Sequence, residues 1–338
     1  MTMAIQSITT GPRQSNFEIL RMIAMFLVLL VHANFMSIGK PSALDIHENF
    51  LASETRLLIQ TVSLYGVNIF VLISGWFSIK TSVKGLSNLL FQVYYFGVLI
   101  LAVLTATGME QFSVGRLYQI VLLHKSGWFV VSYVILYLLS PVLNKFSEYA
   151  SKKEFKTILL SYFAMLIVYG YIDWSPEIGR GYSALSMVGI YLLGRYARLY
   201  VKFNHGFMLF VVCTLINTAL TTSVILFDLP LIINSYDNPF VILGALGLII
   251  CFSKLNIKQS KIVNYIARST FAVYLLHIYP EMLEKFCNIC KDLFVNSSGV
   301  TCLVRMFAFL ILVYAVSIIL DIPRRLIWKY GLKRIIKN

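Results

Sequence analysis

The sequence has little charge and shows no regular alternation of polar and apolar residues. Asp, Glu, Lys and Arg make up only 13% of the 338 residues, whereas 58% are hydrophobic and the mean hydropathy is +0.77. A soluble protein of this length needs a more charged surface. The apolar runs are long and continuous, whereas the strands of a membrane barrel would alternate. The composition therefore predicts an all-α, polytopic bundle of transmembrane helices.

Cysteines, repeats and processing signals are also scarce. The five cysteines are scattered, and Cys287 and Cys290, which we place in a loop, have no second pair with which to build a zinc site. The first apolar run is too long for a cleavable signal peptide, and no small-residue cleavage site follows it. No internal repeat of the kind found in many transporters is detectable. We therefore expect no metal site, no bound cofactor and an uncleaved first span.

The apolar segments predict ten membrane spans with both termini in the cytoplasm. With the amino terminus inside, the cytoplasmic segments hold 21 of the 29 Lys and Arg residues, as the positive-inside rule requires. This asymmetry explains the net charge of +14, so we expect contact with membrane lipids and none with nucleic acid. The predicted spans are residues 17–36, 57–79, 85–107, 127–143, 157–172, 182–200, 207–227, 239–253, 264–284 and 300–320.

The whole chain, residues 1–338, is predicted to form a single membrane-embedded domain. The longest outer connections, 37–56, 108–126 and 285–299, are too short to hold a further domain. The tail from 323 to 338 is basic with apolar residues interleaved, a pattern typical of an amphipathic segment on the anionic inner leaflet.

The first span carries the most informative ionisable residues, Glu18, Arg21 and His32. Arg21 and His32 are eleven residues apart, which on a helix puts them on one face with roughly 16 Å of rise between them. Such side chains face a bundle interior or an aqueous cavity rather than lipid. The imidazole suits general-base or acyl-carrier chemistry, and Arg21 suits an anion such as phosphate, with Glu18 as its i,i+3 partner. Alternatively, His32 only packs against a neighbouring helix, and Arg21 is an ordinary cation that flanks the membrane span.

Other spans supply further polar groups. Asn68 and Ser74 interrupt the apolar second span, and His277 falls in the same outer half of the membrane as His32. Trp128 and Tyr133 are predicted near the outer interface, where they would either stack on a sugar or belong to the aromatic belt of the membrane.

Cations at the inner surface would face a phosphate-bearing substrate. Lys80 and Lys84 follow the second span, and Arg195 and Arg198 end the sixth. Arg305 is predicted to be buried on the outer side of the last span, where it needs a partner.

Four motifs in this order resemble the bacterial acyltransferase-3 family of integral membrane O-acyltransferases. The run 18–21 (EILR) followed by His32 is similar to the D-x-L-R and histidine with which members of that family open, with Glu in place of Asp. The segments 66–75, 128–141 and 274–277 (YLLH) are similar to the motifs that follow.

One departure concerns the inner surface. Many members carry a cytoplasmic Arg-x-x-Arg after the second motif, where this chain has Lys80 and Lys84. Lysine lacks the bidentate fork of a guanidinium, which weakens the case for anion binding by this segment.

The resemblance implies a bacterial plasma-membrane enzyme with acyl-CoA, most simply acetyl-CoA, as its donor. The implied acceptor is a hydroxyl of an envelope or capsular polysaccharide or of its lipid-linked precursor. On this interpretation His32, Arg21 and Glu18 form the catalytic set. The CoA would be bound by Lys80, Lys84, Arg195 and Arg198, and the supporting or acceptor-binding residues would be His277, Ser74, Asn68, Trp128 and Tyr133.

Two other classes of protein stay open as alternatives. A transporter or polymerase of lipid-linked glycans would also have many helices and buried charges, but the long outer loop of a polymerase and the repeats of a flippase are not seen. A structural subunit of an assembly complex would not need the paired Arg21 and His32.

Overall fold

The computed structural model describes residues 13–172, 179–332 and 335. Within them the secondary structure is helical, with no strand. A π-helical turn, His32–Met36, continues the first helix. The α-helices are α1 (Ser15–Val31), α2 (Ala43–Glu48), α3 (Phe50–Phe77), α4 (Val83–Ala106), α5 (Val114–Val121), α6 (Gly127–Tyr149), α7 (Lys152–Leu166), α8 (Ala184–Tyr200), α9 (Gly206–Leu226), α10 (Pro239–Lys254), α11 (Lys261–Ile266), α12 (Thr270–Ile278), α13 (Pro280–Val295) and α14 (Gly299–Ile327).

Six of the helical segments in the described residues are long and apolar enough to cross a membrane. They are Ser15–Met36, Phe50–Phe77, Val83–Ala106, Gly127–Tyr149, Gly206–Leu226 and Gly299–Leu332. Each of the ten predicted spans falls on helix, but the others are shorter or broken. The prediction of a helical membrane bundle is therefore confirmed, whereas ten spans and two cytoplasmic termini stay predictions.

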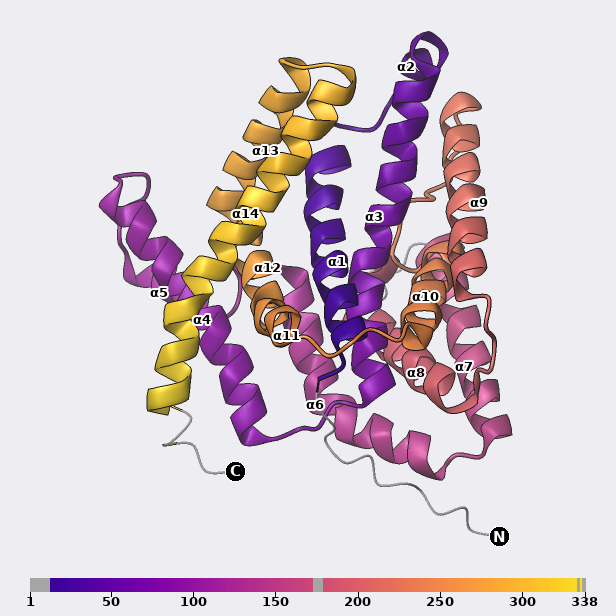
Figure 1. Ribbon diagram of the computed structural model, residues 1–338, viewed down its shortest axis with the longest axis horizontal. Helices are drawn as coiled ribbons and strands as arrows, with labels where there is room; N and C mark the ends of the chain where they lie inside the picture. Colours follow the sequence, from indigo (N-terminus) through magenta and orange to yellow (C-terminus); the bar gives the residue numbers. More distant parts are fainter. Residues whose placement is uncertain (1–12, 173–178, 333–334, 336–338) are drawn as a thin grey trace.

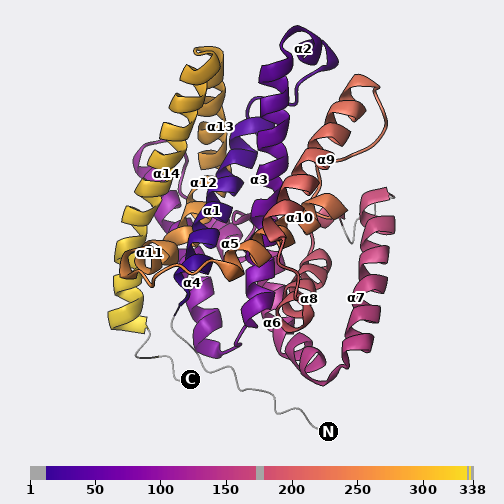
Figure 2. The same ribbon diagram turned by 45° about the vertical axis from the view of Figure 1, so that its right-hand side comes forward.

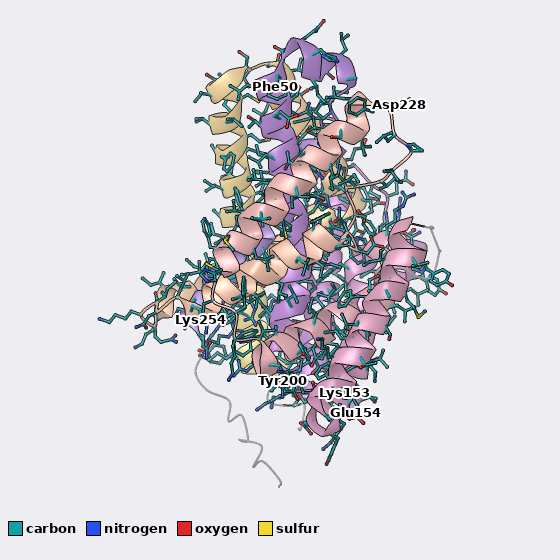
Figure 3. The ribbon with its side chains drawn as sticks, turned by 90° about the vertical axis from the view of Figure 1, so that its right-hand side faces the viewer. Phe50, Lys153, Glu154, Tyr200, Asp228 and Lys254 are labelled. Carbon is teal, nitrogen blue, oxygen red and sulfur yellow. The ribbon has the colours of Figure 1, made fainter. Side chains whose placement is uncertain are left out.

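The bundle is built around α1 and α3, which lie side by side at its centre (Figures 1 and 2). The start of α1 and the end of α14 lie at one end of the bundle, and α2 lies at the opposite end (Figure 1). Figure 3 shows the same polarity, with Lys153 and Lys254 toward one end and Phe50 and Asp228 toward the other. The predicted inner-surface cations thus gather at one end of the molecule.

Glycines allow α3 to approach both of its neighbours closely. A Cβ at Gly66 would come within 2.7 Å of the carbonyl oxygen of Ala24 in α1. A Cβ at Gly75 would overlap the carbonyl of Tyr191 in α8, and one at Gly194 would overlap that of Leu72. Small residues at such crossings bring helix backbones into van der Waals contact, which drives association where apolar surface alone gives no preference over lipid.

The predicted ninth span, residues 264–284, is wrong as a single straight helix. It is divided among α11, α12 and α13, and the chain is extended at Tyr279 (φ −57°, ψ 127°) before Pro280 begins α13. Proline disfavours a helical conformation in the residue before it and has no N–H to donate. Glu281, in the first turn of α13, pairs with Lys125 at 2.5 Å and Arg116 at 3.6 Å, so this break is held by charges from the α4–α6 connection.

Three local predictions are also corrected. Cys287 and Cys290 lie in helix α13 and not in a loop, and both thiols are free. Arg305 is exposed on α14 and not buried. The helix α14 runs through Pro323 to Ile327, so the predicted tail begins as a continuation of the last span. Residues 333–334 and 336–338 of that tail lie outside the described residues.

Candidate functional site

His32 and His277 form a direct pair inside the bundle. The Nδ1 atom of His32 lies 2.9 Å from Nε2 of His277, although 245 positions separate them in the sequence. His32 opens the π-helical turn at the end of α1, and the Ser37 hydroxyl donates a hydrogen bond to its carbonyl oxygen at 2.5 Å. His277 lies in the last turn of α12, just before the break at Tyr279, and is only 3% exposed. Irregular turns thus place both imidazoles, which is common at functional sites.

The hydrogen-bond network assigns a tautomer to each ring. The Nδ1 atom of His277 lies 2.6 Å from the carbonyl oxygen of Val273, which can only accept, so this nitrogen carries the proton. In the neutral ring Nε2 of His277 is then an acceptor, and Nδ1 of His32 donates to it. The remaining nitrogen of His32, Nε2, is left with a free lone pair. In this arrangement His277 orients the ring of His32 and leaves the Nε2 atom of His32 able to accept a proton.

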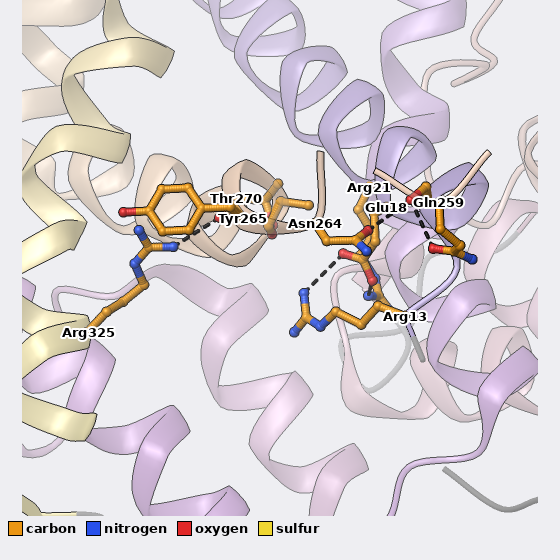
Figure 4. Close-up of polar contacts among 10 residues, drawn as sticks. Arg13, Glu18, Arg21, Gln259, Asn264, Tyr265, Thr270 and Arg325 are labelled. Carbon is orange, nitrogen blue, oxygen red and sulfur yellow. Dashed lines mark hydrogen bonds and ion pairs between the residues drawn. The ribbon is translucent and has the colours of Figure 1, made fainter. Parts of the chain in front are cut away.

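Glu18 and Arg21 form the predicted i,i+3 pair, together with a cation that the sequence did not single out. Arg21 donates to Oε1 of Glu18 at 2.5 Å, and Arg13 donates to Oε2 at 3.1 Å (Figure 4). The carboxylate of Glu18 is almost fully enclosed, whereas the side chain of Arg21 keeps 28% of its surface exposed. Arg268 also lies near enough to Arg13 to interact with it electrostatically. Two guanidinium groups therefore bind one carboxylate and a third lies near Arg13, which leaves an excess of positive charge.

Ser74 and Tyr133 meet between α3 and α6. Their hydroxyl oxygens are 3.1 Å apart, and Ser74 donates to the carbonyl of Phe70, so Tyr133 donates to Ser74. Arg21 lies close enough to Tyr133 for an electrostatic interaction. Asn68, by contrast, does not join this group, because its amide donates to the carbonyl of Tyr236 in the α9–α10 connection at 2.9 Å.

The segment that carries Lys80 and Lys84 is fixed to its neighbours at its backbone. Tyr191 of α8 accepts the N–H of Ile79 at 3.0 Å, and Asn144 of α6 donates to the carbonyl of Ile79 at 2.9 Å. Tyr191 also donates to Asn144 at 2.6 Å, which closes the network. Both backbone groups of one residue are thus held, so the lysines extend from an ordered connection between α3 and α4.

Arg195 and Arg198 lie at the end of α8, close to that connection. Arg195 is only 7% exposed, and its Nε and Nη1 atoms are buried without a hydrogen-bond partner among the described residues. Arg198 lies over the rings of Phe77 and Trp76, 5.3 and 5.8 Å from their centroids. A buried guanidinium with unpaired donors is costly unless an anion completes it. These two arginines supply forked donors beside the segment in which lysines replace the Arg-x-x-Arg of many family members.

Aromatic rings extend from the histidine pair into the bundle. Tyr274 packs edge-on against His277 with centroids 5.9 Å apart, and Phe129 lies 5.4 Å from Tyr274. Trp128 contacts Phe129, and Tyr133 stacks on Phe129 at 5.7 Å. Trp128 and Tyr133 therefore belong to one interior cluster of rings, which disfavours the aromatic-belt interpretation.

Several residues of the site escaped the sequence analysis. Arg13, Tyr191 and Asn144 have no motif of their own, and only their contacts show their role. Asp321 was detectable as a carboxylate inside the last apolar run. It is fully buried, binds Arg324 at 2.6 Å and accepts from Ser269 at 2.7 Å, which ties α14 to the start of α12. No group of three or more potential metal ligands gathers anywhere in the described residues.

The helical membrane bundle and its interior histidine pair define a class: integral membrane proteins with paired histidines between their helices. A comparison with family models narrows this class. The model described as an acyltransferase domain, that of the acyltransferase-3 family, matches residues 14–322. The chain therefore belongs to the acyltransferase-3 family and is a membrane acyltransferase. No curated protein and no solved structure matches it.

Proposed function

We propose that this protein transfers an acyl group, most simply acetyl, from cytoplasmic acyl-CoA to a sugar hydroxyl. The acceptor is an envelope or capsular polysaccharide or its lipid-linked precursor, and the reaction takes place at the bacterial plasma membrane. The observation that carries this proposal is the His32–His277 pair, whose tautomers leave His32 Nε2 as an oriented base in the bundle interior.

The donor would enter from the end of the bundle that carries the arginines. Arg21, with Glu18 and Arg13 beside it, binds the CoA phosphates, helped by Arg195 and Arg198 and by Lys80 and Lys84 on the adjoining connection. Arg21 and His32 lie roughly 16 Å apart along α1. The long pantetheine arm of CoA spans this distance, and it carries the thioester toward His32.

The chemical step needs a base and a leaving thiolate. Nε2 of His32 takes the proton of the sugar hydroxyl, the oxygen attacks the thioester carbonyl, and the C–S bond breaks. The imidazolium then returns its proton to the departing CoA sulfur. A relay in which Nε2 first accepts the acyl group uses the same nitrogen, so the geometry supports both routes equally.

The test uses purified protein in nanodiscs with radiolabelled acetyl-CoA. We expect Arg21→Ala to lose acetyl-CoA binding, and His32→Ala to keep binding but lose the slow release of CoA. Matched controls are Arg305→Ala and His124→Ala, which remove an exposed arginine and an exposed histidine. Undiminished CoA release by a folded His32→Ala variant would refute the role of His32. Failure of folded wild-type protein to bind short acyl-CoAs would instead favour a transporter of lipid-linked glycans.

A further inference from the structure

Three aromatic rings from separate parts of the chain meet at a place that two further rings, Phe129 and Tyr274, connect to His277. The ring centroids of Trp128 and Tyr182 are 4.8 Å apart, those of Tyr182 and Tyr236 are 4.9 Å apart, and Trp128 lies 5.8 Å from Tyr236. Tyr236 is buried, whereas 47% of Tyr182 is exposed. We call Trp128, Tyr182 and Tyr236 the ring cluster. Tyr182 is the exposed member of the ring cluster, and its ring contacts those of Tyr236 and Trp128.

An unusual backbone leads into the ring cluster. Gly179, Arg180 and Gly181 all adopt positive φ angles, of 54°, 55° and 87°. Glycine adopts this conformation without steric cost, but a residue with a Cβ is destabilised in it. Arg180 alone of the three has a side chain, and no described carboxylate forms an ion pair with it. Strain of this kind, held by its surroundings, is concentrated at functional sites.

The α9–α10 connection holds this backbone in place. The N–H of Tyr236 donates to the carbonyl of Arg180 at 3.3 Å, and a Cβ at Gly181 would lie 2.6 Å from Cβ of Tyr236. Asp237 follows, with one carboxylate oxygen bonded to Ser235 and the other buried without a partner among the described residues. It faces a cavity of about 10 Å³, which has room for a single water. Burial raises the pKa of Asp237, and the nearby charge of Arg180 partly offsets this.

The ring cluster connects to the proposed base through touching side chains. Trp128 packs on Phe129 at 5.9 Å, Phe129 on Tyr274 at 5.4 Å, and Tyr274 on His277 at 5.9 Å. Contacting side chains therefore connect Tyr182 to His277, which bonds His32.

We infer that the ring cluster, with Arg180, is the subsite for a pyranose ring of the acceptor. An exposed aromatic face flanked by a second ring matches the apolar C–H face of a sugar, and a forked guanidinium matches its hydroxyl oxygens. Asp237 and Tyr182 both lie close enough to Arg180 for an electrostatic interaction. This inference rests on the proposed function. It adds Arg180, Tyr182 and Tyr236 to Trp128 as residues that bind the acceptor.

The first test separates sugar binding from folding at the strained residue. Arg180→Gly removes the guanidinium and relieves the backbone, so we expect an unchanged or higher thermal midpoint but about tenfold less O-acetyl on the surface glycans of cells that depend on this protein. Asp228→Gly relieves a similar positive φ (48°) away from the ring cluster, and we expect it to leave the O-acetyl content unchanged. Wild-type O-acetyl content in the Arg180→Gly cells would overturn the subsite.

The second test addresses the rings directly. Tyr182→Ala should lower the O-acetyl content about fivefold to tenfold. Tyr182→Phe should keep the wild-type content, because the ring and not the hydroxyl contacts the sugar. A photoreactive benzoylphenylalanine at position 182 should cross-link to glycan, whereas one at exposed Tyr149 should not. Cross-linking at both positions or at neither would refute the inference.

Failure of the subsite is distinguishable from failure of the proposed function. In purified protein all these variants should release CoA from acetyl-CoA at the wild-type rate, since none of them changes the histidine pair or the arginines proposed to bind CoA. If wild-type protein releases no CoA and the cells carry no O-acetyl groups, the proposed function fails. If both are present but the ring-cluster variants match wild type, the subsite alone fails.

Discussion

His32 differs from an ordinary buried histidine in the contact that its Nδ1 atom makes. Because the carbonyl of Val273 fixes the proton on Nδ1 of His277, Nε2 of His277 can only accept, and Nδ1 of His32 donates to it. The Nε2 atom of His32 therefore carries a lone pair. The sequence predicted both histidines in the outer half of the membrane and Arg21 and His32 on one face of the first helix. It did not show that the two imidazoles touch, because no local pattern encodes a contact between residues so far apart in the chain.

Removal of the second imidazole should therefore impair chemistry without impairing donor binding. We expect His277→Ala to lower kcat for acyl transfer by about 100-fold, since both tautomers of His32 become accessible and its ring loses orientation. The KM for acetyl-CoA should not change. His277→Gln, whose side-chain oxygen can still accept from His32 Nδ1, should recover part of the loss. Steady-state kinetics of the three proteins decide the matter, and a His277→Ala enzyme with wild-type kcat would count against the assigned tautomers.

Arg195 is a second residue whose surroundings set its expected role. Its Nε and Nη1 atoms, buried without a hydrogen-bond partner among the described residues, cost stability in the free protein and become useful only when an anion binds. We expect Arg195→Met to raise the thermal midpoint by about 2–4 °C and to weaken CoA binding roughly tenfold. Thermal unfolding with and without CoA measures both effects. Arg305→Met, the same change at an exposed position, should leave CoA binding intact; a less stable Arg195→Met protein with normal CoA affinity would make Arg195 a structural residue.

At the scale of the helices, the crossing of α3 and α8 brings together the cations that we propose to bind the donor. Gly75 and Gly194 allow the backbones to touch, and the contact carries Arg195 and Arg198 to the end of α3, next to Lys80 and Lys84. The break between α12 and α13 fixes the position of His277, which lies in the last turn of α12. The apolar runs predicted where helices lie, but the ninth predicted span was continued through Pro280 to residue 284, although Glu281 and Glu284 follow the proline, and the break was missed.

A methyl group at the α3–α8 crossing should separate the helices. We expect Gly75→Ala to destabilise the fold by about 1–3 kcal/mol, because the added Cβ overlaps the backbone of Tyr191, which cannot move independently of its helix. Gly115→Ala in α5 is the matched control, since a Cβ there meets only Ser113 Oγ at 3.8 Å, and it should be neutral or stabilising. Thermal unfolding in one detergent compares the two. Equal midpoints for both variants would show that the crossing tolerates separation.

At the scale of the whole molecule, the distribution of charge predicts its orientation. Lys153 and Lys254 lie toward one end of the bundle, and Asp228 lies toward the other (Figure 3). The positive-inside rule places the basic end in the cytoplasm. This orientation gives the arginines access to cytoplasmic acyl-CoA and turns Asp228 toward the outer surface.

Single cysteines report this orientation. In a variant that lacks the five native cysteines, we expect Asp228→Cys to react with an impermeant maleimide in intact cells. Lys153→Cys and Lys254→Cys should react only after the membrane is opened. The reverse pattern would invert the orientation and remove the argument for a cytoplasmic donor.

The sequence alone determined the class of fold, the positions of the apolar helices, the distribution of cations and the relation of Arg21 to His32. All of these follow from composition and helical spacing, which are local properties of the chain. Only the tertiary structure decided which polar groups meet: His32 with His277, Arg13 with Glu18, and Tyr182 with Tyr236 and Trp128. These contacts depend on close helix crossings and on breaks in regular helix, where packing overrides local preference.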